Sequence, residues 1–215
     1  MSTVELAPDA LTHRQRKKKA TRRALHIAAL DLVEAHGLSG ATVEAISERA
    51  GVASRTFWSY FSSKEGAVVD HDPDRPETLR RALLARPAGE DPLTALQRVL
   101  EEDMASRMLD KDEAQRRFDL LRSEPHLMSA VAANFETIER ALVSAVAERT
   151  GLNPDNDLYP ALVVSAACGA CRVAQMRWRG QRGRPSLGSL IQGAFAQLAG
   201  GLDTPLPRRA ARSAG

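Results

Sequence analysis

Two groups of side chains in the sequence have residue types and a spacing that could support chemistry. Cys168 and Cys171 form a C-x-x-C pair, which suits a redox switch or half of a metal site. His71 lies among three aspartates in the segment 70–74, where a cation could bind. However, zinc needs about four ligands, and a thioredoxin-type pair follows a strand rather than lying inside an apolar helical segment. We therefore interpret the cysteines as structural and 70–74 as a polar connector, and we predict no metal site.

The sequence contains no enzyme motif. A G-x-S-x-G elbow, a P-loop and a dinucleotide fingerprint are all absent, so an enzyme with a basic N-terminal arm is the weaker hypothesis. We predict no catalytic residue and no cofactor. No stretch approaches 18 uninterrupted apolar residues, and the basic run at 14–23 lacks the apolar segment of a signal peptide. We therefore expect a cytoplasmic protein without a membrane partner, whose 215 residues, 43% of them hydrophobic, are enough to build a core.

A basic segment precedes the first long helical pattern. Between His13 and Arg23 the chain has seven Lys and Arg side chains and no acidic one. Such a cluster is the electrostatic footprint of a protein that binds a polyanion. A solvated, disordered terminus would have the same composition, so charge alone does not decide between the two.

The elements that must position these groups are helices. Apolar residues recur with helical spacing, and the alternation typical of strands is absent, which predicts an all-α fold of about nine helices. Gly37 is suited to end the first helix because glycine tolerates positive φ. A capping box of Ser62 with Glu65 opens a short helix before a break at 72–76. The longer helical patterns cover 15–36, 43–50, 54–60, 76–86, 91–109, 111–124, 126–150, 157–179 and 186–201.

Residues 43–60 have the arrangement helix, three-residue turn, helix. The turn contains Gly51, and Thr42 is placed to cap the helix before it. This is the spacing of a helix-turn-helix, whose second helix enters the major groove of DNA, about 12 Å wide, while the first braces it across the backbone. The second helix directs Phe57 and Phe61 toward a small core and presents polar side chains outward.

The stretch 42–65 resembles the helix-turn-helix of the TetR family of transcriptional regulators, and the resemblance extends over about residues 14–68. It departs from the family pattern at Ala53, where Ser is common, and at Trp58, where Tyr is common. The matching positions include Thr42, Ala50-Gly51-Val52, Thr56, Tyr60-Phe61 and Lys64-Glu65.

The resemblance implies roles for single residues at double-stranded DNA. Ser54, Arg55 and Ser59 fall at variable positions that read bases, and Arg55 could bond guanine O6 and N7, worth about 1–3 kcal/mol of discrimination. A phosphate clamp is the alternative for Arg55, and structural packing is the alternative for Trp58. The expected contacts to phosphate and sugar are Arg22, Arg23, Thr42, Thr56, Trp58, Tyr60 and Lys64.

The resemblance also implies the domain organisation. We expect a DNA-binding domain over 14–68, a helical ligand-binding and dimerisation domain over 69–204, and disordered ends at 1–13 and 205–215. The last two helices combine an apolar stripe with small residues, as in a four-helix bundle between two copies, although an intramolecular core is the alternative. The expected interface residues are Leu162, Ser165, Ala166, Gly169, Leu187, Leu190, Ile191, Ala194, Phe195 and Leu198.

A ligand pocket is expected within the second domain. Its candidates are large apolar residues, a kind of side chain that more often forms plain core. They are Met104, Met108, Phe118, Leu121, Met128, Phe135 and Trp178. The arginine-rich segment 177–185 is similar to that of actinobacterial TetR-type regulators suspected of sensing acyl-CoA-like effectors, which suggests an effector of that class.

These features predict a homodimer that binds a palindromic operator and represses transcription until a small-molecule effector lowers its DNA affinity. The alternative is a DNA-binding regulator without a small ligand, controlled by a protein partner or by oxidation of Cys168 and Cys171.

Overall fold

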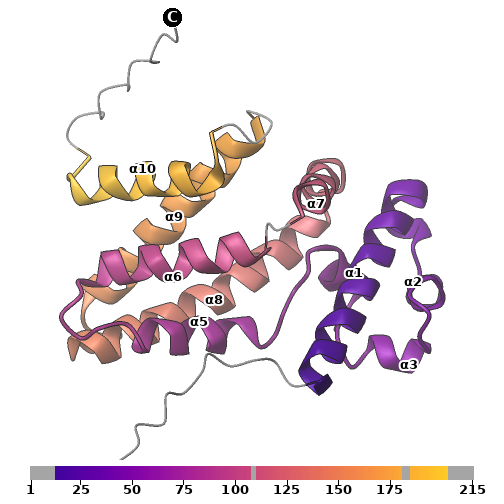
Figure 1. Ribbon diagram of the computed structural model, residues 1–215, viewed down its shortest axis with the longest axis horizontal. Coiled ribbons are helices and arrows are strands. Elements are labelled where there is room, and N and C mark those ends of the chain that lie inside the picture. Colours follow the sequence, from indigo (N-terminus) through magenta and orange to yellow (C-terminus); the bar gives the residue numbers. More distant parts are fainter. Residues whose placement is uncertain (1–12, 108–109, 181–184, 203–215) are drawn as a thin grey trace, which may run out of the picture. The chain divides into compact units, whose positions relative to one another are not determined.

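The computed structural model describes residues 13–107, 110–180 and 185–202, and all regular structure in these ranges is helical (Figure 1). The all-α prediction is therefore confirmed. The described residues form ten helices, in agreement with the expected count of about nine. Their bounds are α1 His13–Gly40, α2 Val43–Arg49, α3 Ser54–Phe57, α4 Lys64–Val68, α5 Arg75–Leu84, α6 Pro92–Arg107, α7 Lys111–Ser123, α8 Leu127–Thr150, α9 Leu158–Gly180 and α10 Leu187–Ala199.

The chain folds into two compact units, each with its own core. The first unit comprises residues up to 72 together with 112–134, and the second comprises 73–111 and the residues from 135 onward. The break at 72–76 thus coincides with a boundary between units. The segment 112–134, which the sequence assigns to the second domain, joins the first unit because Leu120 and Leu127 are buried in its core.

The expected disordered ends, 1–13 and 205–215, lie outside the described residues except for His13, which begins α1. In the first unit, α1 buries Leu25, Ala29 and Val33 against α2 and α4. Its regular course is interrupted at Gly37, where φ is 71°, a conformation that side chains with a Cβ rarely adopt. The positive φ predicted there is confirmed.

The short helix α4 begins with a different cap from the one that the sequence predicts. Ser63 is the N-cap: its backbone is extended, and its Oγ accepts a hydrogen bond from the Gly66 N–H at 2.9 Å. Ser62 is exposed and lies one residue before the cap. The capping box of Ser62 with Glu65 is therefore wrong by one position, because two adjacent serines both offer a hydroxyl and only the backbone decides which one caps.

In the second unit, α6, α9 and α10 pack around a core that includes Leu96, Val164, Ile191 and Phe195. Arg149 near the end of α8 fastens the turn between α5 and α6. Its guanidinium donates to four backbone carbonyls of that turn, those of Leu83, Arg86, Pro87 and Glu90, at 2.8–3.1 Å.

Among the described residues, α9 is long and apolar enough to cross a membrane by those two measures alone. The core helix of a folded domain passes the same test. Here α9 packs against α6 and α10 and buries Ala167, Ala174 and Trp178, so we interpret it as a core helix.

Candidate nucleic-acid interface

The two helices of the helix-turn-helix are held together by a small apolar contact, a side-chain cap and two features of the turn between them. Ile46 of α2 and Phe57 of α3 are fully buried in one core. The Thr42 Oγ1 accepts from the Ala45 N–H at 3.2 Å and caps α2 as predicted. Gly51 takes a φ of 69° in the turn, and the Val52 N–H donates to the Ser47 carbonyl at 2.9 Å. These contacts fix the direction in which α3 presents its other side chains.

The outer surface of α3 carries the side chains predicted to read bases. Arg55 and Ser59 are exposed, and Ser54 is half-buried. The helix itself ends at Phe57, so Ser59 lies in the turn that follows and not on the helix, as the range 54–60 had implied. Their roles at DNA stay predictions.

Trp58 is the large apolar side chain of this surface. It is 57% exposed, and its ring meets the Phe57 ring edge-on, with centroids 5.3 Å apart. One edge of Trp58 is therefore fixed by the core while the rest faces outward, which suits a contact to sugar or to a thymine methyl. The other predicted backbone contacts on this side, Thr56 and Tyr60, are half-buried, and Thr42 is exposed.

Arg22 has several partners inside the first unit. Its guanidinium donates to the carbonyls of Tyr60 and His71, pairs with Asp70 at 3.1 Å and lies 4.3 Å from the centre of the Phe61 ring. The side chain is only 14% exposed. These internal bonds give Arg22 a structural role that the sequence did not predict, and its phosphate contact stays a prediction.

Lys64 is likewise engaged within the unit. Its Nζ donates to the Leu38 carbonyl at 2.6 Å and to the Ala41 carbonyl at 3.0 Å, where it satisfies acceptors left after the turn at Gly37. These two bonds give Lys64 a structural role, and its phosphate contact stays a prediction. Arg23 is 58% exposed and pairs with Glu113 at 2.7 Å.

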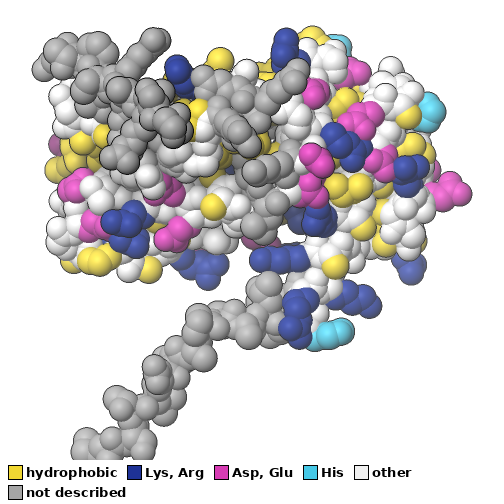
Figure 2. Space-filling model, turned by 45° about the horizontal axis from the view of Figure 1, so that its top comes forward, with side chains coloured by type: hydrophobic (Ala, Val, Ile, Leu, Met, Phe, Trp, Pro, Cys, Tyr) yellow, Lys and Arg dark blue, Asp and Glu magenta, His cyan; other side chains and the backbone are white. Residues whose placement is uncertain are grey.

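A basic surface that the single-residue predictions passed over is formed by the first two turns of α1, residues 13–20. Every side chain described there is exposed, and five of them are Lys or Arg. Figure 2 shows these Lys and Arg side chains gathered where α1 begins. The charge run signals this surface, and the helix expected from residue 15 covers most of it; the structure begins that helix two residues earlier, at His13.

Polar contacts fasten α7 to α1 within the first unit. Arg116 pairs with Asp31 and with Glu34, and the Glu124 carboxylate accepts from the Leu38 N–H at 3.1 Å. No sequence signal links these residues, since they lie far apart in the chain. An open pocket of about 420 Å³ lies beside this contact, lined by Val33, Glu34, Gly37, Arg116, Asp119, Leu120, Ser123 and Glu124.

His26 of α1 is a buried residue that faces α7. Its Nδ1 lies 2.7 Å from the Ala67 carbonyl, and its Nε2 lies 3.5 Å from Glu113 Oε1. The hydrogen bond with the adjacent His26 imidazole, together with the Arg23 guanidinium, holds the pKa of Glu113 down to about 2 against the opposing effect of burial. The carboxylate of Glu113 is thus stabilised in its charged form between α7 and α1.

The candidates for a ligand pocket are not brought together in one unit. Of those described, Phe118, Leu121 and Met128 belong to the first unit, and Met104, Phe135 and Trp178 belong to the second. Met104 and Trp178 are each 5% exposed within the core of the second unit, whereas Met128 is 53% exposed. Met108 lies outside the described residues. These seven residues were chosen by type, which does not distinguish core from cavity lining.

Six of the ten residues predicted for the dimer interface lie on α10 and pack on the core of one chain. Leu187, Ile191 and Phe195 are buried, and Leu190, Ala194 and Leu198 are half-buried against the same core. The first three are thus part of the intramolecular core, the alternative kept open above, and an interface role of the other three stays a prediction. The predicted residues of α9 differ: Leu162 is 67% exposed, Ser165 is exposed, and Ala166 and Gly169 are half-buried.

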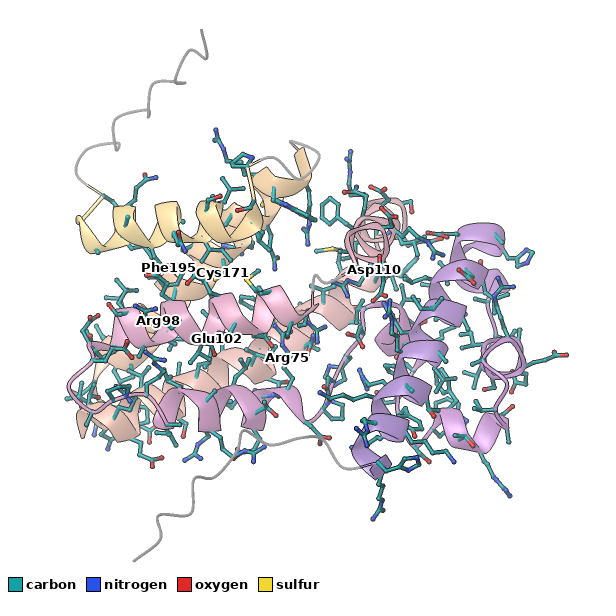
Figure 3. All side chains as sticks on the ribbon, in the orientation of Figure 1. Arg75, Arg98, Glu102, Asp110, Cys171 and Phe195 are labelled. Carbon is teal, nitrogen blue, oxygen red and sulfur yellow. The ribbon has the colours of Figure 1, made fainter. Side chains whose placement is uncertain are left out.

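Cys168 and Cys171 lie inside α9 in the core of the second unit. Figure 3 shows Cys171 close to Phe195, which belongs to the same core. Burial raises the pKa of both thiols to about 12, so the reactive thiolate is disfavoured. The oxidation switch is therefore not favoured. His71 bonds Asn134 at 2.9 Å, and among the described residues no group of three or more His, Cys, Asp and Glu is arranged to hold a metal ion.

An exposed helix-turn-helix joined to a separate helical unit is the architecture of a DNA-binding transcriptional regulator. Residues 27–68 match the family model of the bacterial regulatory proteins of the tetR family, and residues 90–203 match that of the MftR C-terminal domain. The chain is 33% identical over 171 residues to the HTH-type transcriptional regulator TcmR of Streptomyces glaucescens, covering 77% of this chain and 76% of TcmR.

Solved structures agree in fold. The fatty acid degradation regulator FadR of Bacillus halodurans has a TM-score of 0.56 at 19% identity, covering 85% of this chain and 96% of that one. FadR of Bacillus subtilis in complex with stearoyl-CoA has a TM-score of 0.54 at 17% identity, covering 83% of this chain and 98% of that one. The chain belongs to the TetR family of transcriptional regulators, a family of regulators and not of enzymes.

Proposed function

We propose that this regulator is a homodimeric repressor that binds a palindromic operator and is released from it by a small-molecule effector. The observation that carries the proposal is the surface of α3. Arg55 is exposed on this helix and Trp58 is exposed directly after its end, and the buried Phe57 between them fixes both in place. A preorganised surface of this kind can enter the major groove without first being ordered.

A dimer is supported by the exposed face of α9. Leu158, Leu162, Val173 and Met176 are all more than half exposed along this helix. Ser165, Ala166 and Gly169 lie between them and are small enough to let a second helix approach closely. A contiguous apolar stripe on a regulator is typical of a partner surface, and a second copy of the same stripe is self-complementary under two-fold symmetry.

The effector class follows from the neighbours in fold and remains the part of the proposal that needs its own assay. FadR of Bacillus subtilis was solved with stearoyl-CoA. Acyl-CoA thioesters are therefore the first effectors to test, and release from DNA is their expected effect. We place the protein in the cytoplasm, where operator and thioester meet.

The test of the proposal is base reading by Arg55. Duplexes that bind the protein would first be selected from a random library, and affinity would be measured by fluorescence anisotropy for the selected duplex and for a scrambled one. Arg55→Ala is expected to weaken binding to the selected duplex about 5- to 150-fold, which corresponds to about 1–3 kcal/mol, and to leave the scrambled duplex nearly unaffected.

Arg49→Ala is the matched control, because Arg49 is an exposed arginine of α2 that pairs with Asp31. It is expected to change both affinities little. Equal losses on both duplexes for Arg55→Ala would leave Arg55 with a phosphate contact only. Failure of the wild-type protein to select any sequence would overturn the proposed function itself.

A further inference from the structure

The first two turns of α1, the basic turns 13–20, form a helix that has no core to pack on. Every side chain described there is exposed, and burial begins further along α1, at Leu25. At 1.5 Å per residue, the basic turns are about 12 Å long. These turns continue a helix that is packed from Leu25 onward, so they need no separate nucleation, but they gain no stability from burial of their own.

The charges of the basic turns work against the helix. No acidic residue stands in the first turn of α1 to balance the positive end of the helix dipole. Arg14 and Lys17, and likewise Arg16 and Lys19, are three residues apart, a spacing that places like charges side by side on a helix surface. In the described part of the chain, no ion pair joins these four cations to an acid. An anionic partner would remove both penalties.

The position of the basic turns narrows the choice of partner. Arg22, one turn further along α1, donates to the Tyr60 carbonyl and stacks on Phe61, directly after the exposed surface of α3. Figure 1 shows the beginning of α1 and α3 at the same end of the first unit. A polyanion held by α3 therefore passes near the basic turns.

We propose that Arg14, Arg16, Lys17 and Lys19 form a second, sequence-independent DNA contact that binds backbone phosphates flanking the bases read by α3. The proposal rests on the proposed DNA-binding function and extends its footprint. A membrane surface fits less well, because the basic turns offer no large apolar side chain to insert among lipids. In this arrangement the phosphates supply the negative charge that the start of α1 lacks.

The experiment replaces these four residues by glutamine, as R14Q/R16Q/K17Q/K19Q, in the full chain. Affinity for the selected duplex and for a scrambled duplex of equal length is measured at several salt concentrations. Each lost phosphate contact lowers the slope of log affinity against log salt by about 0.9, so a decrease of about 0.9 to 3.6 per protomer is expected. Both duplexes should lose affinity by the same factor, which keeps their ratio unchanged.

The matched control carries the same change in charge elsewhere. R81Q/R98Q/R122Q/R140Q removes four exposed arginines that lie outside the basic turns, and it is expected to retain the wild-type salt slope. Thermal unfolding of both variants shows whether they fold. If R14Q/R16Q/K17Q/K19Q keeps the full salt slope of the wild-type protein, the proposal is overturned, while base reading by Arg55 is unaffected. If the control variant loses as much of the salt slope, the effect comes from net charge alone and the proposal is wrong.

Two further experiments test where the basic turns bind. Trimming the selected duplex from its ends should abolish the difference between wild type and the glutamine variant at the length where the flanking phosphates are removed. Vesicles of phosphatidylglycerol test the other anionic partner. Binding of the wild-type protein to these vesicles, lost in the glutamine variant while the DNA slope is unchanged, would assign the basic turns to lipid and refute the DNA contact.

Discussion

Arg22 shows how the role of a single residue depends on partners that a local pattern does not contain. It stands in a run of basic residues, which favours a phosphate contact. Its actual partners are the Tyr60 and His71 carbonyls and Asp70, 38 to 49 residues away in sequence. The long side chain of Arg22 folds back into the unit, whereas the cations before it are exposed.

Arg22→Ala is therefore expected to destabilise the first unit more than it weakens DNA binding. The change leaves two carbonyls and one carboxylate without their donor, a loss of about 2–4 kcal/mol in the free energy of unfolding. Chemical denaturation followed by the fluorescence of Trp58, in a Trp178→Phe background, reports this unit alone.

Arg23→Ala serves as the comparison, because Arg23 is largely exposed and its ion pair with Glu113 is worth at most about 1 kcal/mol. If the two variants unfold at the same denaturant concentration, Arg22 has no structural role beyond that of a surface arginine.

At the scale of elements, the sequence predicted most helices closely because their signals are local. Gly37, Thr42 and Gly51 mark ends, a cap and a turn through their own backbone preferences, and all three behave as expected. The short helices were harder. The choice between Ser62 and Ser63 as a cap is decided by the extended backbone at Ser63, and the end of α3 at Phe57 has no marker in residue type.

The attachment of α7 to α1 lay beyond sequence reasoning for a physical reason. It depends on pairs such as Arg116 with Glu34, in which each partner taken alone reads as an ordinary surface charge. The same holds for the interior. Ile191 and Leu162 both fit an apolar stripe by spacing, yet the first is buried in its own unit and the second is exposed.

This attachment should make the first unit sensitive to acid through Glu113. The pKa of Glu113 is lowered to about 2 from its ordinary value of 4.5, so its contribution to stability is complete above about pH 4.5 and is lost as the pH falls toward 2. Glu113→Gln should lower the free energy of unfolding by about 2–3 kcal/mol near pH 6 and by little near pH 2.

Denaturation curves over this pH range, read from Trp58 as above, test the prediction. Glu48→Gln, which removes an exposed carboxylate of α2, is the control and should run parallel to wild type. A constant difference between Glu113→Gln and wild type from pH 6 to pH 2 would show that the carboxylate of Glu113 is not stabilised by its neighbours.

At the scale of the whole molecule, the proposed dimer rests on the exposed face of α9. Leu162→Arg places a charge in the middle of the exposed apolar stripe and is expected to convert the dimer to a monomer, measured by sedimentation at micromolar concentration. Affinity for a palindromic duplex should fall with it, because each half-site is then bound separately.

Met128→Arg is the matched control: Met128 is an exposed apolar residue of the first unit and is not part of the α9 stripe. It should leave the dimer intact. A Leu162→Arg protein that still sediments as a dimer would place the interface on another surface.

The brevity of α3 has a consequence for the genome that this regulator must search. Four helical residues span about 6 Å, which is less than two steps of stacked base pairs at about 3.4 Å each. So short a helix contacts few base pairs, while a chromosome offers about a million or more competing sites. In the proposed dimer, most of the discrimination between sites then comes from the spacing of the two half-sites and from how readily the duplex between them deforms. Operators of this protein should therefore tolerate a substituted base pair better than an inserted one.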